Sequence, residues 1–90
     1  MAPWRFLITP EAENDLGRLD ASVRARVVEK LKWLISNFEE ITPIPLGNSL
    51  RGFFKLRIGT WRVIYETDTT VTTVVVHAIG PRDKIYKKKK

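Results

Sequence analysis

The sequence contains no cysteine, which excludes disulfides, thiolate nucleophiles and cysteine-based zinc sites. It contains one histidine, His77, so a histidine-based metal site or a Ser-His-Asp arrangement would depend on that residue alone. No apolar run approaches the roughly 20 residues of a membrane-spanning helix, and the N-terminus lacks the basic segment and long apolar stretch of a signal peptide. We therefore expect a cytoplasmic protein with no metal, no cofactor and no membrane partner.

The residues that are present suffice for one small core. The chain has 90 residues, of which 43% are hydrophobic, and this composition argues against a disordered chain. The formal net charge is +6, and it falls to +2 without the four lysines at Lys87–Lys90. We expect one domain over residues 1–86 followed by a basic, solvated tail over residues 87–90. The net charge suggests an acidic partner.

The N-terminal part predicts a strand followed by a helix. Trp4–Ile8 is rich in aromatic and branched residues, which favours a first strand. Thr9 and Pro10 then mark a helix start, because a threonine oxygen caps free amide groups and proline fits the first turn. The short helix has an apolar stripe, and Asp15 is among the residues expected to lie off it.

A second helix is predicted from about Ser22 to Asn37, after a break at Asp20. Its apolar residues recur at spacings of three and four, which indicates one buried face. Trp33 lies off this stripe, so we expect it to be partly exposed at the margin of the core, with a partner-binding role as the alternative. From Glu39 to Ser49 prolines and a glycine interrupt the pattern, which predicts a loop. The apolar stripe consists of Val23, Val27, Leu31, Leu34 and Phe38.

The most informative stretch is Leu50–Glu66, which predicts two strands joined by a turn at Gly59 and Thr60. Successive side chains of a strand point to opposite faces, so the first strand has an apolar face and a cationic face. Lys55 and Arg57 form the cationic face, and an arginine of the second strand can lie across from them. The apolar face consists of Phe54, Leu56 and Ile58.

One more strand is predicted over Val71–Ile79, and its nearly continuous apolar centre suits an inner position in a sheet. The order is therefore strand, helix, helix and three strands that can form an antiparallel meander. Helices segregated from strands along the chain predict an α+β fold in which the helical hairpin packs on one face of the sheet. The other face is left for Lys55, Arg57 and Arg62, and Arg82 can reach the same end of the sheet.

Four segments occur in order after the helical hairpin: LRG, KLR, GTWRVIYE and IGPRDKIY. This ordered set resembles the RelE/ParE toxin superfamily from the first strand to Tyr86. The resemblance implies a toxin of a type II toxin-antitoxin pair that is neutralised by a cognate antitoxin. The RelE-like branch cleaves messenger RNA on the ribosome without a metal, and the ParE-like branch poisons DNA gyrase. An arginine followed by a C-terminal tyrosine favours the RelE-like branch.

The resemblance also implies site residues. Lys55 and Arg57 match the basic positions of the KLR strand, Arg62 matches the arginine of the second strand, and Arg82 and Tyr86 match the C-terminal arginine and tyrosine. These five are the candidate catalytic residues. Some RelE-like proteins carry a second lysine at the position of Phe53, so this chain departs from the pattern there. The candidate RNA-binding residues are Arg51, Lys55, Arg57, Lys84 and Lys87.

The implied chemistry is attack of the RNA 2′-hydroxyl on the adjacent phosphate. Lys55 is the candidate base, because crowding by neighbouring cations favours its neutral form. Arg62, with Arg57 or Arg82, is expected to clamp phosphate oxygens through paired N–H donors. Tyr86 is expected to stack on a base or orient the 2′-hydroxyl.

Simpler interpretations stay open at this point. Lys55 and Arg57 could form an ordinary solvated sheet face, and Arg62 could pair with Glu66 on the same strand. His77 is expected to be a strand residue with a satisfied hydrogen bond rather than a catalyst. For the whole protein, the alternatives are a gyrase inhibitor and a member that only binds its antitoxin.

Overall fold

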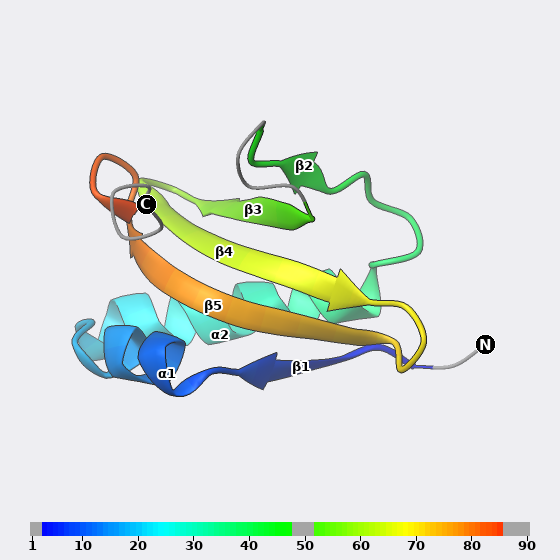
Figure 1. The fold of residues 1–90 in the computed structure, drawn as a ribbon. Helices are drawn as coiled ribbons and strands as arrows, with labels where there is room; N and C mark the ends of the chain where they lie inside the picture. Colours follow the sequence, from blue (N-terminus) through cyan, green and yellow to red (C-terminus); the bar gives the residue numbers. More distant parts are fainter. Residues whose placement is uncertain (1–2, 48–51, 86–90) are drawn as a thin grey trace.

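The computed structural model describes residues 3–47 and 52–85 and shows two helices and five strands (Figure 1). The predicted order of strand, two helices and three strands is confirmed, with one additional short strand. The elements are β1 (Arg5–Ile8), α1 (Pro10–Gly17), α2 (Ala21–Ser36), β2 (Ile44–Pro45), β3 (Phe53–Ile58), β4 (Trp61–Asp68) and β5 (Thr73–Pro81).

All five strands belong to one sheet with the order β1-β5-β4-β3-β2. The strands β3, β4 and β5 form the predicted antiparallel meander. β5 occupies an inner position between β4 and β1, and β1 pairs with it in parallel. The prediction of a loop throughout Glu39–Ser49 was wrong for Ile44–Pro45, because this pair adds an antiparallel edge strand to β3. Proline is tolerated there because an edge strand needs hydrogen bonds on one side only.

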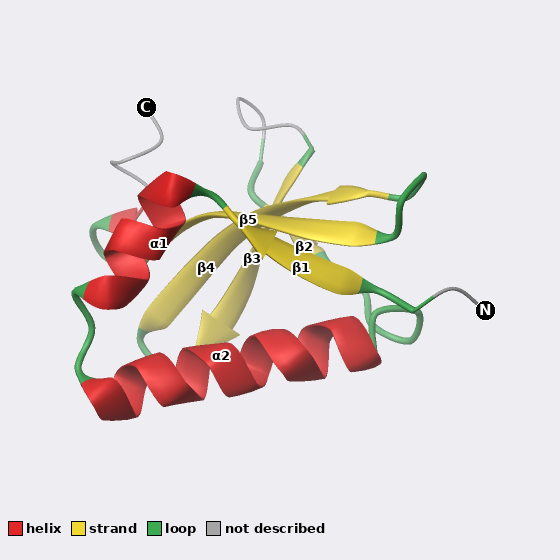
Figure 2. Ribbon diagram, turned by 90° about the horizontal axis from the view of Figure 1, so that it is seen from below, coloured by secondary structure: helices red, strands yellow, loops and turns green. Residues whose placement is uncertain are grey.

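Both helices lie on one face of the sheet, as predicted (Figure 2). Thr9 caps α1, since its Oγ1 accepts a hydrogen bond from the Ala12 N–H at 3.2 Å. The guanidinium of Arg24 closes the turn between the helices by donating to the carbonyls of Leu16 and Leu19, at 3.2 and 2.9 Å. Over residues 3–47 and 52–85, no helix is long and apolar enough to span a bilayer.

The main core lies between α2 and the sheet. The predicted stripe of α2 supplies Val27, Leu31 and Leu34, none of which is accessible to solvent. Burying a side chain of this size stabilises the fold by about 1.5–3 kcal/mol, so this stripe fixes which face of the sheet the helix covers. The strands contribute Leu56, Ile58, Val63, Tyr65, Val74, Val76 and Ile79 to the same cluster.

Asp15 departs from the sequence prediction, because it is buried rather than on a polar helix face. Its Oδ2 accepts a hydrogen bond from the Ile79 N–H at 3.0 Å. β1 pairs with β5 only from Thr73 to Val76, so α1 is the neighbour of β5 beyond that point. The carboxylate thus satisfies a backbone donor that β1 does not reach.

A β-bulge interrupts the pairing of β4 with β5. Ile64 pairs with Ala78 and Tyr65 pairs with Val76, so His77 is the extra residue. The bulge changes the alternation, and Ala78 consequently joins Ile64 on the face opposite the helices. We call this face the open face. A small second cluster covers part of it and consists of Ile64, Ala78 and Ile85 with Leu46 and Phe53 packed against them.

Candidate functional site

The β3–β4 hairpin presents basic side chains as its alternation predicts. Leu56 and Ile58 belong to the main core. Lys55 and Arg57 alternate with them along β3, so both lie on the open face. Lys55 is half-buried and Arg57 is exposed. The predicted turn is confirmed, since only two residues separate the strands and Gly59 adopts a left-handed φ of 60°.

Arg62 lies directly opposite Arg57 in the strand register but is not a surface cation. It is only 8% exposed, and its Nη1 donates to the carbonyl oxygens of Gly59 and Trp61, both at 2.8 Å. The predicted place across from Arg57 is confirmed, but the guanidinium is buried against the hairpin turn and does not extend the cationic surface. The alternative pairing with Glu66 was wrong, because the guanidinium turns back to the hairpin turn.

Arg82 reaches the same end of the sheet, as predicted. Its backbone N–H donates to the Thr60 carbonyl at 2.8 Å, which ties the segment after β5 to the β3–β4 turn. Arg82 and Lys84 are exposed, whereas Ile85 is buried in the second cluster and anchors this segment. The structure thus brings three arginines to the turn end of the sheet: Arg57, Arg62 and Arg82.

Three of the predicted site residues cannot be placed. Arg51, Tyr86 and Lys87 lie outside the described residues. Within residues 3–47 and 52–85, no group of three or more histidine and acidic side chains is arranged to hold a metal ion.

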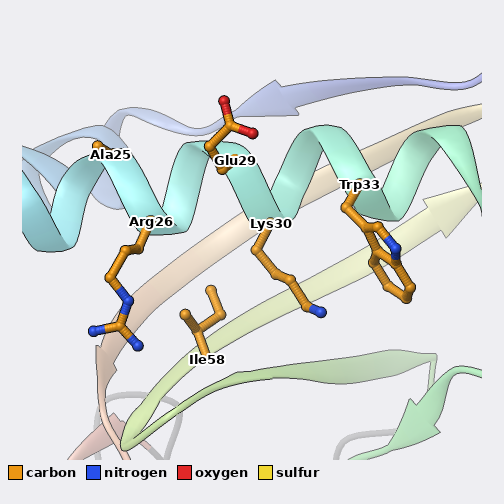
Figure 3. Close-up of a pocket in the computed structure, with 6 residues that line it drawn as sticks. All are labelled: Ala25, Arg26, Glu29, Lys30, Trp33 and Ile58. Atoms are coloured by element: carbon orange, nitrogen blue, oxygen red, sulfur yellow. The ribbon is translucent and has the colours of Figure 1, made fainter.

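The exposed side of α2 contains a hollow of about 440 Å³ beside the hairpin (Figure 3). Trp33 is 42% exposed, which confirms its predicted place at the core margin, and the Lys30 Nζ lies 4.0 Å from the centre of its ring. Arg26, Lys30 and Trp33 project toward the hairpin, whereas Glu29 points away from it (Figure 3). The hollow is lined by Ala25, Arg26, Glu29, Lys30, Trp33 and Ile58.

The position of Arg26 beside the hairpin turn could not be predicted from the sequence. A Cβ atom placed on Gly59 would lie 3.1 Å from the Arg26 Nη2, so α2 passes directly beside the hairpin turn. Helical periodicity predicts only which face of α2 is apolar. It does not predict which strand turn the other face approaches.

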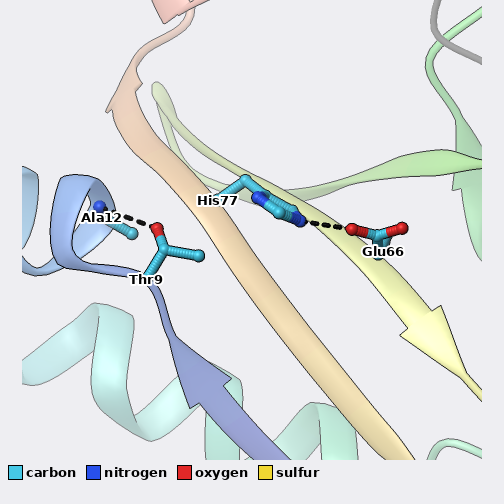
Figure 4. A network of polar contacts seen from close by, with 4 residues as sticks. All are labelled: Thr9, Ala12, Glu66 and His77. Carbon is cyan, nitrogen blue, oxygen red and sulfur yellow. Dashed lines mark hydrogen bonds and ion pairs between the residues drawn. The ribbon is translucent and has the colours of Figure 1, made fainter.

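His77 forms a polar pair on the open face. Its Nε2 lies 2.5 Å from the Glu66 Oε1 (Figure 4), which confirms the expectation of a satisfied hydrogen bond. The Phe53 ring meets the imidazole edge-on, with 5.3 Å between the ring centres. The partners of His77 were not predicted, because they depend on the register of β5 against β4, which the bulge shifts by one residue.

Comparison with known proteins agrees with this architecture. Residues 6–86 match the family described as the ParE toxin of type II toxin-antitoxin systems. The chain is 34% identical over 86 residues to Toxin RelG of Mycobacterium tuberculosis, covering 96% of this chain and 99% of that protein. It is 32% identical over 85 residues to Toxin RelE of the same organism, covering 94% of this chain and 88% of the relative.

Solved structures show the same fold. The toxin-antitoxin complex RelBE2 of Mycobacterium tuberculosis contains a chain that superposes with a TM-score of 0.80 at 33% identity, covering 90% of this chain and 100% of that one. A mutant of the Escherichia coli toxin RelE in the free state superposes with a TM-score of 0.77 at 16% identity, covering 96% and 93%. The chain belongs to the ParE toxin family of type II toxin-antitoxin systems, within the RelE/ParE superfamily.

Proposed function

We propose that this toxin is a metal-independent endoribonuclease that cleaves messenger RNA on the ribosome and thereby inhibits translation. The observation that carries the proposal is the convergence of basic residues. Arg57 and Arg82 are exposed at the turn end of the sheet, and Lys55 lies on the same open face as Arg57. Fixed cations on a rigid sheet suit the binding of a phosphodiester. Curated relatives named Toxin RelG and Toxin RelE support the RelE-like branch.

In the proposed reaction the RNA supplies its own nucleophile. Lys55 takes the proton of the 2′-hydroxyl as this oxygen attacks the adjacent phosphorus. Arg57 and Arg82 hold the phosphate oxygens, whose negative charge increases in the transition state. Arg62 holds the hairpin turn through its hydrogen bonds to the Gly59 and Trp61 carbonyls, and its positive charge lies next to Arg57 and Arg82.

The RNA also requires contacts outside the reacting phosphate. Tyr86 stacks on a neighbouring base or orients the 2′-hydroxyl in this proposal. Arg51, Lys84 and Lys87 contact phosphates along the strand, which contributes affinity without base specificity.

The test is a purified translation system in which messenger cleavage is mapped by primer extension with and without ribosomes. We expect cuts only on translating ribosomes. In Arg82→Ala we expect the rate of cleavage to fall at least about 100-fold. Lys32→Ala is the matched control, because it removes an exposed cation from α2 and not from the open face. An uncut messenger with the unaltered toxin would contradict the proposal.

A second candidate function is poisoning of DNA gyrase. The family model that matches the chain carries the ParE description, and this specific observation favours the alternative. A gyrase-cleavage assay separates the two candidates. Stabilised DNA breaks together with an intact messenger would favour the ParE-like function.

We further propose a cognate antitoxin as the partner, with the hollow on α2 as part of its docking surface. A related toxin chain occurs in the toxin-antitoxin complex RelBE2 of Mycobacterium tuberculosis. The hollow combines the exposed Trp33 with the cations Arg26 and Lys30, which suits an acidic amphipathic helix.

This docking surface predicts a specific loss of affinity. Trp33→Ala removes an exposed aromatic anchor, so we expect the dissociation constant of the cognate antitoxin to rise at least about 10-fold. Val71→Ala is the matched control, because Val71 is 51% exposed, lies in the turn between β4 and β5 and does not line the hollow. Isothermal titration calorimetry gives both constants, and equal affinities of the two variants would exclude the hollow as a docking surface.

A further inference from the structure

A second hollow, of about 210 Å³, lies at the outer edge of β3 and adjoins the hollow on α2. The short β2 leaves room for it, because β2 pairs with β3 only at Phe54 and Lys55. Beyond Lys55, no strand of the described chain lies beside β3 on this side. We call this space the edge hollow. Its lining includes Lys55 and Arg57 from β3, Lys30 and Trp33 from α2, and Tyr65 from β4.

Tyr65 brings an unpaired hydroxyl to the edge hollow. The side chain is 1% exposed and packs in the main core. Over residues 3–47 and 52–85 its hydroxyl has no hydrogen-bond partner, yet no unpaired polar atom of a buried side chain is sealed from solvent. The hydroxyl is therefore the part of Tyr65 that reaches solvent, at the hollow that this residue lines. A buried hydroxyl without a protein partner is available to a ligand.

The size and walls of the edge hollow suit a single flat ring. Its volume is below the roughly 300–1,000 Å³ of pockets that hold drug-sized ligands. Trp33, which is 42% exposed, forms one wall and projects toward the hairpin (Figure 3). Bases of single-stranded RNA bind to proteins by stacking on aromatic side chains and by hydrogen bonds at their edges. An aromatic wall and one free hydroxyl supply both kinds of contact.

The charge around the edge hollow favours RNA as the ligand. Lys30, Lys55 and Arg57 line it, and none of its described lining residues is acidic. Glu29, which precedes Lys30 on α2, points away from the hairpin (Figure 3). Lys55 and Arg57 are also the residues proposed to act on the reacting phosphate, so a ligand of the edge hollow meets the same cations. A nucleotide fits this arrangement, because its base and its phosphate are covalently joined.

We propose that the edge hollow binds the base of a nucleotide next to the cleaved phosphate, an inference that rests on the proposed endoribonuclease function. Trp33 contacts the ring, and the Tyr65 hydroxyl bonds to the edge of the base, since a phenol both donates and accepts. Arg57 holds the phosphate at the mouth of the hollow. Trp33 and Tyr65 position the RNA and take no part in proton transfer.

Removal of one base from the messenger tests this site. Short messengers are placed on the ribosome in three forms: intact, and without the base of the nucleotide on either side of the cleavage position. The ribose keeps its 2′-hydroxyl in every form, so the bonds that form and break are the same. We expect loss of one of these two bases to slow cleavage by the unaltered toxin at least about 10-fold.

Two variants show whether that base lies in the edge hollow. On the intact messenger, Trp33→Ala should slow cleavage about 10-fold and Tyr65→Phe about threefold. On the messenger without that base, both should stay within about twofold of the unaltered toxin, because the contact that they remove is already absent. Thermal unfolding of each variant establishes that it is folded.

Glu29→Ala is the matched control for Trp33→Ala. Glu29 is exposed on the same helix and does not line the edge hollow. This variant should cleave the intact messenger like the unaltered toxin and keep the full effect of base removal.

The outcomes separate the two proposals. If the unaltered toxin leaves the intact messenger uncut on ribosomes, the endoribonuclease function fails and the base site fails with it. If it cleaves all three messengers at the same rate, only the base site is overturned, and the edge hollow is left as a surface for the antitoxin. The base site is also overturned if both variants match the unaltered toxin on the intact messenger. Equal slowing of the intact and base-free messengers by the variants overturns it too, because the variants then act without the base.

Discussion

The two arginines that face each other across the hairpin have different environments and should respond differently to substitution. Arg62 donates to the Gly59 and Trp61 carbonyls and is nearly buried, whereas Arg57 is exposed. Hydrogen bonds from a charged group contribute about 1.5–3 kcal/mol. We expect Arg62→Ala to lower the free energy of unfolding by about 2 kcal/mol, and Arg57→Ala to change it by less than about 0.5 kcal/mol.

Urea unfolding of both variants measures this difference in stability, and cleavage assays measure their activity. Under the proposed function both variants lose activity, but only Arg62→Ala loses stability as well. An Arg62→Ala variant as stable as the unaltered protein would show that the guanidinium does not hold the turn. Arg62 would then be free to contact the RNA directly.

Tyr65 gives the fold a dependence on alkaline pH. Burial raises the pKa of its hydroxyl to about 12 from an ordinary value of 10.0. The unfolded chain therefore loses this proton at lower pH than the folded chain, so the contribution of Tyr65 is complete below about pH 10 and is lost as the pH rises toward 12. A shift of this size corresponds to about 3 kcal/mol in full, of which about 2 kcal/mol is lost by pH 12.

Denaturant unfolding between pH 9 and pH 12 tests this dependence against Tyr65→Phe, which has no proton to lose at this position. The other titrating groups are common to both proteins and cancel in the comparison. The unaltered protein should lose about 2 kcal/mol more than the variant over this range. Parallel stability curves would contradict the assignment of the shift to Tyr65.

At the scale of the elements, local patterns predicted what depends on local sequence. The alternation around Lys55 and Arg57 follows from the two-residue period of a strand, and the cap at Thr9 follows from the chemistry of one side chain. β2 was missed because two residues with a proline have no periodicity. It is defined by its pairing with β3, which is remote in sequence.

In the candidate site, too, some features follow from local sequence and strand order, and others depend on contacts between remote residues. The meeting of Arg57 and Arg82 at one end of the sheet follows from strand order and was predicted. The burial of Arg62 depends on which carbonyls its side chain reaches, and the cluster of His77 with Phe53 depends on a bulge. An apolar run such as Thr73–Ile79 does not indicate where a bulge will occur, because both faces of an inner strand are covered.

Asp15 links α1 to β5 through one buried hydrogen bond, which leads to a prediction for these two elements. Asp15→Ala leaves the buried Ile79 N–H without its acceptor, at a cost of about 1–3 kcal/mol. Asn14→Ala is the matched control, because Asn14 is exposed on the same helix. Hydrogen exchange of the Ile79 amide should accelerate in the Asp15 variant only, and unchanged exchange would contradict the contact.

For the whole molecule, the charge of residues 87–90 is expected to contribute to RNA binding, whereas the residues of the proposed reaction precede this segment. The formal charge of +6 falls to +2 when residues 87–90 are removed. Each lysine that neutralises a phosphate of single-stranded RNA adds about 0.7 to the magnitude of the slope of log affinity against log salt. If all four lysines contact phosphates, truncation after Tyr86 should reduce this slope by up to about 3 and weaken binding most at low salt.

Filter binding to a short single-stranded RNA over a range of salt concentrations measures the slope. A variant in which residues 87–90 are arginine is the matched control, because it keeps the charge and should keep the slope. The truncated toxin should still cleave when the ribosome is saturating, since the residues of the proposed reaction precede the tail. If the slope is the same with and without residues 87–90, the tail does not contact phosphate, and the affinity of the toxin for RNA must come from Arg57, Arg82 and the other basic residues of the folded domain.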